Sequence, residues 1–145
     1  MNNRILVSGG SGRFAQVLKK ENNLLNLKFL SKKEFNILNL KSIEKCLVKY
    51  KPKILIHTAG LSRPMEQHEK DISNSIDLNI IGTANVVKMC KRYNIKIIYF
   101  STNYVYDCIK GNFKETDPIK PINNYGLSKM GGEASVLMYK NSLVL

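Results

Sequence analysis

Five short stretches of this chain are apolar at nearly every position: 4–9, 27–31, 53–60, 95–102 and 142–145. Four stretches between them carry apolar residues three and four apart, which is typical of helices: 13–20, 40–50, 71–93 and the residues after Tyr125. Strands that alternate with helices, and that are apolar on both faces, predict a parallel sheet covered on both sides. We therefore expect an α/β fold, a doubly wound parallel sheet with helices on both faces.

The longest predicted helix lies at 71–93, and it is expected to turn five apolar residues inward: Ile72, Ile76, Ile80, Val87 and Cys90. The stretch 103–124 contains Gly111, Pro118 and Pro121, which predict a loop. The final apolar run has no helix after it, so we expect the domain to end early.

The size and charge of the chain limit its class. Its 145 residues suit one domain with a real core. Its formal net charge is +12, but the lysines are spread along the chain. There is no arginine-rich stripe and no interleaved aromatic run of the kind that binds nucleic acid. We expect no nucleic-acid partner, and instead a basic cleft for a smaller anion such as a dinucleotide or a sugar nucleotide.

The cysteines and histidines predict no metal site. Cys46 and Cys90 fall in helical patterns among apolar residues, where buried thiols are expected, and Cys108 stands apart. An odd number of cysteines without a signal peptide predicts a cytoplasmic protein. The early apolar run is too short to span a membrane, so no membrane partner is expected. His57, and His68 in a polar loop stretch, have no partner at metal spacing, and we interpret both as structural or surface residues.

A glycine-rich turn, GGSGRFA, follows the first predicted strand and opens the first predicted helix. Gly9 and Gly12 match the first two glycines of a G-x-x-G-x-x-G turn, and Ala15 stands in place of the last glycine. Glycine lets the backbone approach a pyrophosphate closely, and the helix N-terminus offers free N–H groups to the anion. The turn favours a dinucleotide cofactor, and hence a Rossmann-type sheet. Its expected cofactor contacts are Gly9, Ser11, Gly12, Arg13 and Phe14.

In a Rossmann-type sheet the second strand usually supplies the group that binds the adenosine ribose, and an acidic residue there favours NAD over NADP. Here Ser31, Lys32 and Lys33 precede Glu34. A lysine can pair with a 2′-phosphate, and Arg13 would help. NADP(H) is therefore favoured and NAD(H) stays open, while lysines on an exposed turn are the alternative interpretation.

In this order the motifs resemble the extended short-chain dehydrogenase/reductases of the NAD-dependent epimerase/dehydratase superfamily, and the resemblance covers essentially the whole chain. HTAG at 57–60 is similar to the family's N-A-G type turn, and LNIIGTANV at 78–86 to its V-N-x-x-G-T-x-N helix. STNYVYD at 101–107 resembles the S-T-D-Y-V-F-D segment of the dTDP-4-dehydrorhamnose reductase branch. ETDPIKPINNYGLSK at 115–129 resembles that branch's E-T-D-P-x-x-P-x-x-x-Y-G-x-x-K run, and FNIL at 35–38 its segment that meets the adenine.

The resemblance implies roles for individual residues. Tyr125 would be the general acid/base, Thr102 would polarise the substrate carbonyl, and Lys129 would hold the nicotinamide ribose. Residues four apart share a helix face, so the ammonium of Lys129 would also favour the phenolate of Tyr125. Asn79 would bind backbone near the site. The further cofactor contacts implied are Asn36, Ile37, Thr58, Ala59, Gly60, Asn79, Tyr125 and Lys129.

The implied activity is hydride transfer between NADP(H) or NAD(H) and a nucleotide-linked sugar, as in a 4-keto-sugar reductase. An epimerase or dehydratase, and a dinucleotide-binding subunit without turnover, stay open as alternatives. Asn103 stands where the branch has aspartate. Family members carry about as much chain again, which forms most of the sugar pocket. We therefore expect residues 1–145 to be the NAD(P)-binding Rossmann domain without the C-terminal substrate-binding part, and a homodimer stays open.

The last predicted helix contains two adjacent glycines, Gly131 and Gly132. Glycine inside a helix costs about 1 kcal/mol relative to alanine. We expect a neighbouring element at close approach to explain both.

Overall fold

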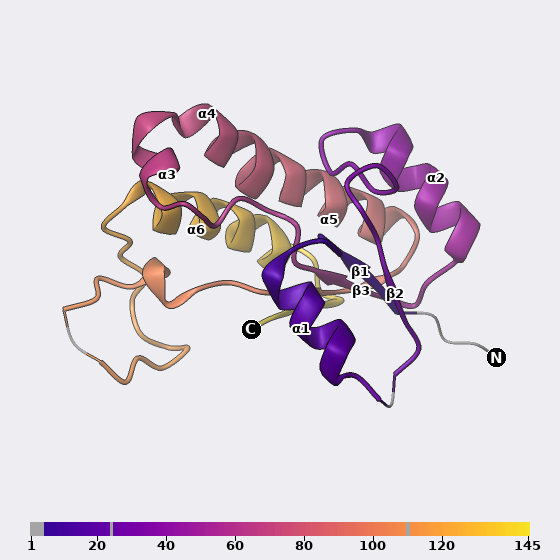
Figure 1. The fold of residues 1–145 in the computed structure, drawn as a ribbon. Coiled ribbons are helices and arrows are strands. Elements are labelled where there is room, and N and C mark those ends of the chain that lie inside the picture. Colours follow the sequence, from indigo (N-terminus) through magenta and orange to yellow (C-terminus); the bar gives the residue numbers. More distant parts are fainter. Residues whose placement is uncertain (1–4, 24, 110) are drawn as a thin grey trace.

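A computed structural model describes residues 5–23, 25–109 and 111–145, whose strands form one five-stranded parallel sheet (Figure 1). The strands are β1 (Ile5–Ser8), β2 (Leu27–Phe29), β3 (Ile54–His57), β4 (Lys96–Tyr99) and β5 (Ser142–Val144). Their order in the sheet is β2-β1-β3-β4-β5. The expected doubly wound α/β fold is confirmed, with each strand shorter than the apolar run that predicted it.

The helices lie on both faces of the sheet. They are α1 (Arg13–Glu21), α2 (Leu40–Tyr50), α3 (Glu66–Lys70), α4 (Ile72–Ser75), the π-helix η1 (Ile76–Ile81), α5 (Gly82–Arg92), the short 3₁₀ helix η2 (Asn103–Val105) and α6 (Asn124–Leu137). Right-handed crossovers place α1 on one face, because its connection runs along the sheet in the direction opposite to the others. Figure 1 shows α2, α5 and α6 together on the other face.

The core lies between the sheet and the three helices α2, α5 and α6. Leu6, Leu55 and Ile97 form one row across β1, β3 and β4, and all are fully buried. The buried residues that cover this row from α2 and α5 are Ile43, Cys46, Leu47, Val86 and Cys90. The prediction of buried thiols at Cys46 and Cys90 is therefore confirmed.

The opposite face of the sheet is covered by α1 alone among the helices that the structure describes. Val7, Ile56, Ile98 and Leu143 form a row on this face across β1, β3, β4 and β5. Val7 is buried, Ile56 and Ile98 are partly buried, and Leu143 is 42% exposed. The sheet therefore becomes more open from β1 toward β5.

The single helix expected at 71–93 is wrong in its first half. The segment is divided into α4, η1 and α5, and a π-helix adds a residue to a turn and so rotates what precedes it. Ile72 and Ile76, expected inward, are 51% and 40% exposed, while Ser75 and Asn79 are buried instead. Polar contacts of these two residues with other segments decide the rotation. Of the other residues predicted on the inner side, Val87 and Cys90 are buried and Ile80 is partly buried.

His68 does not lie in a loop. It lies in the short helix α3, fully buried, with its Nδ1 at 2.8 Å from Ser75 Oγ and its ring centre at 4.9 Å from that of Tyr125. A single inward residue in a polar run has no hydrophobic period, so the sequence pattern could not place it. A structural role for this histidine agrees with its burial.

Among the described residues, no helix has the length and apolar character that a membrane crossing requires. In the same part of the chain, no three His, Cys, Asp or Glu side chains gather as a metal ion would require.

Candidate active site

The turns after β1 and β3 touch each other at the carboxyl ends of the strands. Gly9 has a φ of +70°, and a Cβ on it would lie 2.8 Å from the backbone nitrogen of Ala59. The Gly12 N–H donates to the Gly9 carbonyl oxygen at 2.8 Å, which closes the loop. Only glycine suits position 9, because both its conformation and its neighbour exclude a side chain.

Helix α1 starts at this loop with its first N–H groups uncapped by any side chain. A hollow of about 370 Å³ opens beside it, lined by Gly12, Arg13, Phe14, Ala15, Thr58, Gly60, Ser62 and Arg63. Five of these residues are predicted cofactor contacts: Gly12, Arg13, Phe14, Thr58 and Gly60. Ser62 and Arg63 belong to no motif, so sequence reasoning could not identify them. A glycine cradle, a free helix N-terminus and two arginines suit a phosphate-bearing ligand.

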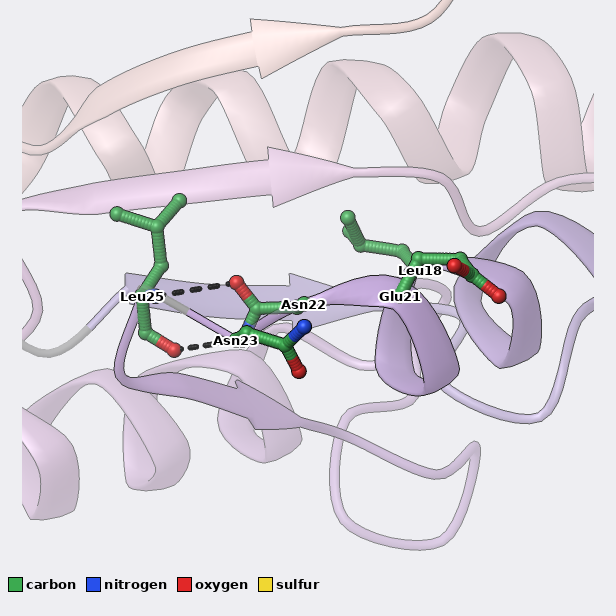
Figure 2. Close-up of a pocket in the computed structure, with 5 residues that line it drawn as sticks. All are labelled: Leu18, Glu21, Asn22, Asn23 and Leu25. Atoms are coloured by element: carbon green, nitrogen blue, oxygen red, sulfur yellow. Dashed lines mark hydrogen bonds between the residues drawn. The ribbon is translucent and has the colours of Figure 1, made fainter.

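A second hollow, of about 500 Å³, lies where α1 ends (Figure 2). It is lined by Leu18, Glu21, Asn22, Asn23 and Leu25, and the Asn22 side chain bonds both backbone groups of Leu25. It is at the edge of the sheet away from the carboxyl ends of the strands. None of the predicted site residues lines it, so it does not belong to the candidate site.

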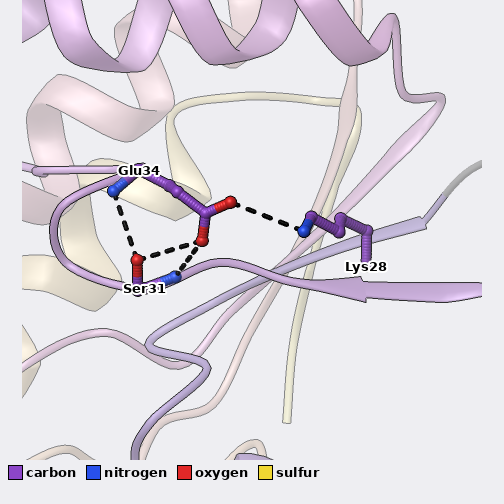
Figure 3. A network of polar contacts seen from close by, with 3 residues as sticks. All are labelled: Lys28, Ser31 and Glu34. Atoms are coloured by element: carbon purple, nitrogen blue, oxygen red, sulfur yellow. Dashed lines mark hydrogen bonds and ion pairs between the residues drawn. The ribbon is translucent and has the colours of Figure 1, made fainter.

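The turn after β2 is ordered by a carboxylate (Figure 3). Glu34 Oε2 accepts hydrogen bonds from the backbone N–H and the hydroxyl of Ser31, both at 3.0 Å, and Lys28 Nζ lies 3.4 Å from Oε1. The backbone hydrogen bond from Ser31 is the main reason why the pKa of Glu34 is lowered. The acid is thus already paired within the protein, whereas Lys32 and Lys33 are exposed.

Two further predicted contacts, Asn36 and Ile37, follow this turn. The Asn36 N–H donates to Ser42 Oγ at 3.0 Å, and the Ile37 carbonyl accepts from Asn85 Nδ2 at 3.1 Å. The Ile37 side chain is 5% exposed and packs against Gly82. A Cβ on Gly82 would lie only 2.6 Å from Ile37 Cδ1. The Ile37 side chain is therefore buried inside the protein and is not available to a ligand.

Asn79 is buried behind the turn that follows β3. Its Oδ1 accepts from the Leu61 N–H at 2.7 Å, and its Nδ2 donates to the Leu61 carbonyl at 2.8 Å and to Ser128 Oγ at 2.9 Å. A Cβ on Gly60 would lie 2.7 Å from Asn79 Oδ1. The amide thus ties the turn to α6, and it supports the hollow from behind.

Tyr125 lies in the first turn of α6, whose N-cap Asn123 accepts from the Gly126 N–H at 2.8 Å. Its ring packs against His68 and, at 5.6 Å between ring centres, against Tyr104. Burial raises the pKa of Tyr125, while a hydrogen bond with the Thr102 side chain and the charge of Arg63 act in the opposite direction. Thr102 and Tyr125 are therefore brought together, with Arg63 nearby.

Lys129 is turned toward the end of β4. Its Nζ donates to the Phe100 carbonyl at 2.6 Å and lies 4.1 Å from the centre of the Tyr99 ring. Burial lowers the pKa of Lys129 to about 8, partly offset by Glu133. The expectation that Lys129 lowers the pKa of Tyr125 is wrong in this structure. Lys129 is held by another partner, and desolvation of the phenolate dominates.

Comparisons with known proteins agree with this geometry. A family model described as the RmlD substrate binding domain matches residues 3–145. A dTDP-4-dehydrorhamnose reductase of Aggregatibacter actinomycetemcomitans is 31% identical over 138 residues, which are 92% of this chain and 47% of that protein. Methionine adenosyltransferase 2 subunit beta of Bos taurus is 26% identical over 147 residues, 94% of this chain and 43% of that protein. The chain thus spans about half the length of the curated relatives it matches.

Solved structures match over nearly the whole chain. A dTDP-4-dehydrorhamnose reductase of Bacillus anthracis, in complex with NADP, has a TM-score of 0.90 at 26% identity and covers 99% of this chain and 52% of its own. A dTDP-4-dehydrorhamnose reductase of Clostridium acetobutylicum has a TM-score of 0.85 at 23% identity and covers 97% of this chain and 51% of its own. The second likeness establishes the fold alone.

Proposed function

This chain belongs to the RmlD substrate binding domain family, and from that membership we propose that it is the cofactor-binding part of an NADP(H)-dependent oxidoreductase acting on a nucleotide-linked sugar. The observation that carries the proposal is the hollow at the carboxyl ends of β1 and β3. There the glycine cradle and the start of α1 lie next to the turn that bears Thr58 and Gly60. The pair Thr102 and Tyr125 lies close by.

The residues of the hollow fit a dinucleotide. Gly12 lines the hollow without a side chain that would occupy it, and α1 offers a pyrophosphate its uncapped N–H groups. NADP(H) is favoured over NAD(H) for three reasons. Glu34 is occupied by Ser31 and Lys28, Lys32 is free to meet a 2′-phosphate, and the B. anthracis relative binds NADP.

The catalytic roles follow from position and charge. When bound, the dinucleotide supplies the hydride for the carbonyl carbon of the sugar. Burial keeps the Tyr125 hydroxyl protonated at neutral pH, so it suits donation of a proton to the carbonyl oxygen. Thr102 would hydrogen-bond the same oxygen as charge develops on it. Lys129, with its ammonium at the end of β4, would hold the ribose hydroxyls of the cofactor.

We also propose that residues 1–145 form the cofactor-binding domain, and that the sugar pocket requires polypeptide equivalent to the other half of the relatives. The open side of the sheet supports this proposal, since apolar residues of β4 and β5 have no covering helix there among those described. The matched share of the relatives, 47% and 43%, also supports it.

A second candidate is a dinucleotide-binding subunit without turnover of its own. The observation that favours it is the likeness to a protein named as a subunit, methionine adenosyltransferase 2 subunit beta. Both candidates require the dinucleotide site, and only the first requires a proton donor at Tyr125.

The deciding experiment measures thermal unfolding with NADPH and with NADH. Ligand at about a hundredfold above its Kd should stabilise the parent protein by ~2.7 kcal/mol. Gly12→Val should remove this stabilisation, whereas the control Gly111→Val should keep it, because a Cβ at position 111 meets open space. No stabilisation of the parent by either dinucleotide would contradict the proposal.

Turnover then separates the two candidates, in a form of the protein that contains its sugar-binding half. With a nucleotide-linked 4-keto sugar, Tyr125→Phe should lower turnover by about 10²–10⁴-fold and leave NADPH affinity unchanged. A parent that binds NADPH yet never oxidises it would favour the subunit.

A further inference from the structure

A chain of buried polar side chains crosses the interior between the sheet and helices α5 and α6. Ser8 ends β1, His57 ends β3 and Thr83 lies in α5, and each is at most 1% exposed. Ser8 Oγ lies 2.8 Å from His57 Nδ1, and His57 Nε2 lies 3.2 Å from Thr83 Oγ1. Both nitrogens of a fully buried imidazole therefore have a hydroxyl partner.

The hydrogen bonds from Ser8 to His57 and from His57 to Thr83 allow only one arrangement of protons. Ser8 Oγ accepts from the backbone N–H groups of Thr58 at 3.2 Å and Ala59 at 3.3 Å, so its own proton is left for His57 Nδ1. A neutral imidazole has one N–H, which then sits on Nε2 and is donated to Thr83 Oγ1. The ring stays neutral because burial, with the charge of a nearby lysine, lowers the pKa of His57 to about 3.

The second half of the chain reaches helix α6. Thr83 hydrogen-bonds the Tyr99 hydroxyl, and Tyr99 donates to the backbone carbonyl of Lys129 at 3.4 Å. Gly132 leaves the space for this contact, because a Cβ there would lie 2.7 Å from the Tyr99 hydroxyl and 3.4 Å from Thr83 Oγ1. Hydrogen bonds that run in one direction strengthen one another. The chain thus links the turn after β3 to the helix that bears Tyr125.

We propose that His57 is a positioning residue of the dinucleotide site, which holds the turns after β1 and β3 in place and couples them to helix α6. At one end its partner Ser8 accepts hydrogen bonds from the backbone N–H groups of Thr58 and Ala59, next to the hollow. At the other end the same ring is joined to the backbone of Lys129. The proposal rests on the proposed function, because it assigns to His57 an effect on dinucleotide binding.

A role in packing alone would require only the volume of the ring. His57→Phe keeps a ring beside Tyr99, whose ring centre is 5.8 Å away, but leaves the hydroxyls of Ser8 and Thr83 without their partner. Thr83→Val removes the hydroxyl that links His57 to Tyr99 and keeps a side chain of similar size. Val86→Ala is the matched control, since Val86 is fully buried in α5, one turn after Thr83, and takes no part in these hydrogen bonds.

The first measurement is the Kd for NADPH of the parent and the three variants, with each melting temperature. His57→Phe and Thr83→Val should each weaken NADPH binding by about tenfold, and the double variant by no more than the stronger single one. Val86→Ala should lower the melting temperature and leave the Kd unchanged. Parent-like binding by Thr83→Val, or equal weakening by Val86→Ala, would overturn the proposal.

The second measurement is made without ligand, so that it stays decisive if no dinucleotide binds and the proposed function itself fails. Amide hydrogen exchange in Thr83→Val should accelerate both at residues 58–59 and at residues 129–133, whereas Val86→Ala should affect α5. The ¹⁵N spectrum of the parent imidazole should show the Nε2–H tautomer. Acceleration limited to α5 in both variants, or an Nδ1–H tautomer, would refute the coupling.

Discussion

The ammonium of Lys129 is held between the Phe100 carbonyl and the face of the Tyr99 ring, and this environment has a consequence for stability. Burial lowers the pKa of Lys129 to about 8 in the folded protein, from an ordinary value near ~10.4 in the unfolded chain. Between these two values the unfolded state binds more protons than the folded state. The protein therefore gains stability from this residue as the pH rises through that window.

Lys129→Met removes the titrating group, so the comparison with the parent isolates it. We expect the unfolding free energy of the parent, minus that of the variant, to rise between pH 8 and about 10.4, by at most about 1.4 kcal/mol per pH unit. Chemical denaturation at several pH values measures this difference. Lys70→Met, at an exposed position on α3, controls for the loss of a lysine as such. A difference that stays flat with pH would show that Lys129 is not desolvated.

Lys32 gives a second prediction at the scale of one residue. If it meets the 2′-phosphate of NADP(H), Lys32→Ala should weaken NADPH binding more than NADH binding, and added salt should shrink the parent's preference. Titrations of both dinucleotides at low and high salt measure the preference. Lys41→Ala, at an exposed position of α2, is the control. An unchanged ratio in Lys32→Ala would leave Lys32 as an ordinary surface charge.

At the scale of elements, α6 lies so close to η1 that one of its glycines has no room for a side chain. A Cβ on Gly132 would lie 2.5 Å from the backbone oxygen of Asn79, whereas a Cβ on Gly131 would lie 3.0 Å from the side chain of Ile80. The Ile80 side chain can rotate away, but backbone cannot. The close neighbour expected from the two adjacent glycines is therefore present, and it is rigid only at Gly132.

The two alanine substitutions should therefore differ in sign. Gly131→Ala should be neutral or stabilising by up to about 1 kcal/mol, because alanine favours a helix. Gly132→Ala should destabilise by about 1–3 kcal/mol, as overpacking does, and should also disturb the Tyr99 hydroxyl. Chemical denaturation of both variants measures the contrast. Equal effects would mean that α6 and η1 are less tightly packed than described.

The elements also show which parts of this protein the sequence could predict. Strong periods predicted α2 and α5, and local motifs predicted the glycine loop that opens α1. The π-helix could not be predicted, because it depends on contacts of Ser75 and Asn79 with α3 and the turn after β3. The same holds for Arg63 in the hollow and for the partners of His57. Such residues are joined only by the fold, and no spacing along the chain encodes them.

At the scale of the whole molecule, the two faces of the sheet are unequally covered. The face with α2, α5 and α6 has a closed core, but on the other face exposure grows toward β5, and Leu145 is 59% exposed. The contact of Phe14 with Phe100, 4.4 Å between ring centres, closes this face only beside α1. Parallel sheets are ordinarily covered on both faces. We propose that the substrate-binding half packs against this open region.

The 145-residue chain should therefore bind a dye specific for exposed apolar surface, such as ANS, and should self-associate as its concentration rises. Leu143→Lys places a charge on the open face, where the side chain is 42% exposed, so it should reduce both effects with little loss of stability. Leu127→Lys, at an exposed position of α6, is the control and should change neither effect. A form extended by the half that the relatives carry should bind no dye at this face. Strong dye binding by that extended form, or by Leu143→Lys, would show that the apolar surface lies elsewhere on the molecule.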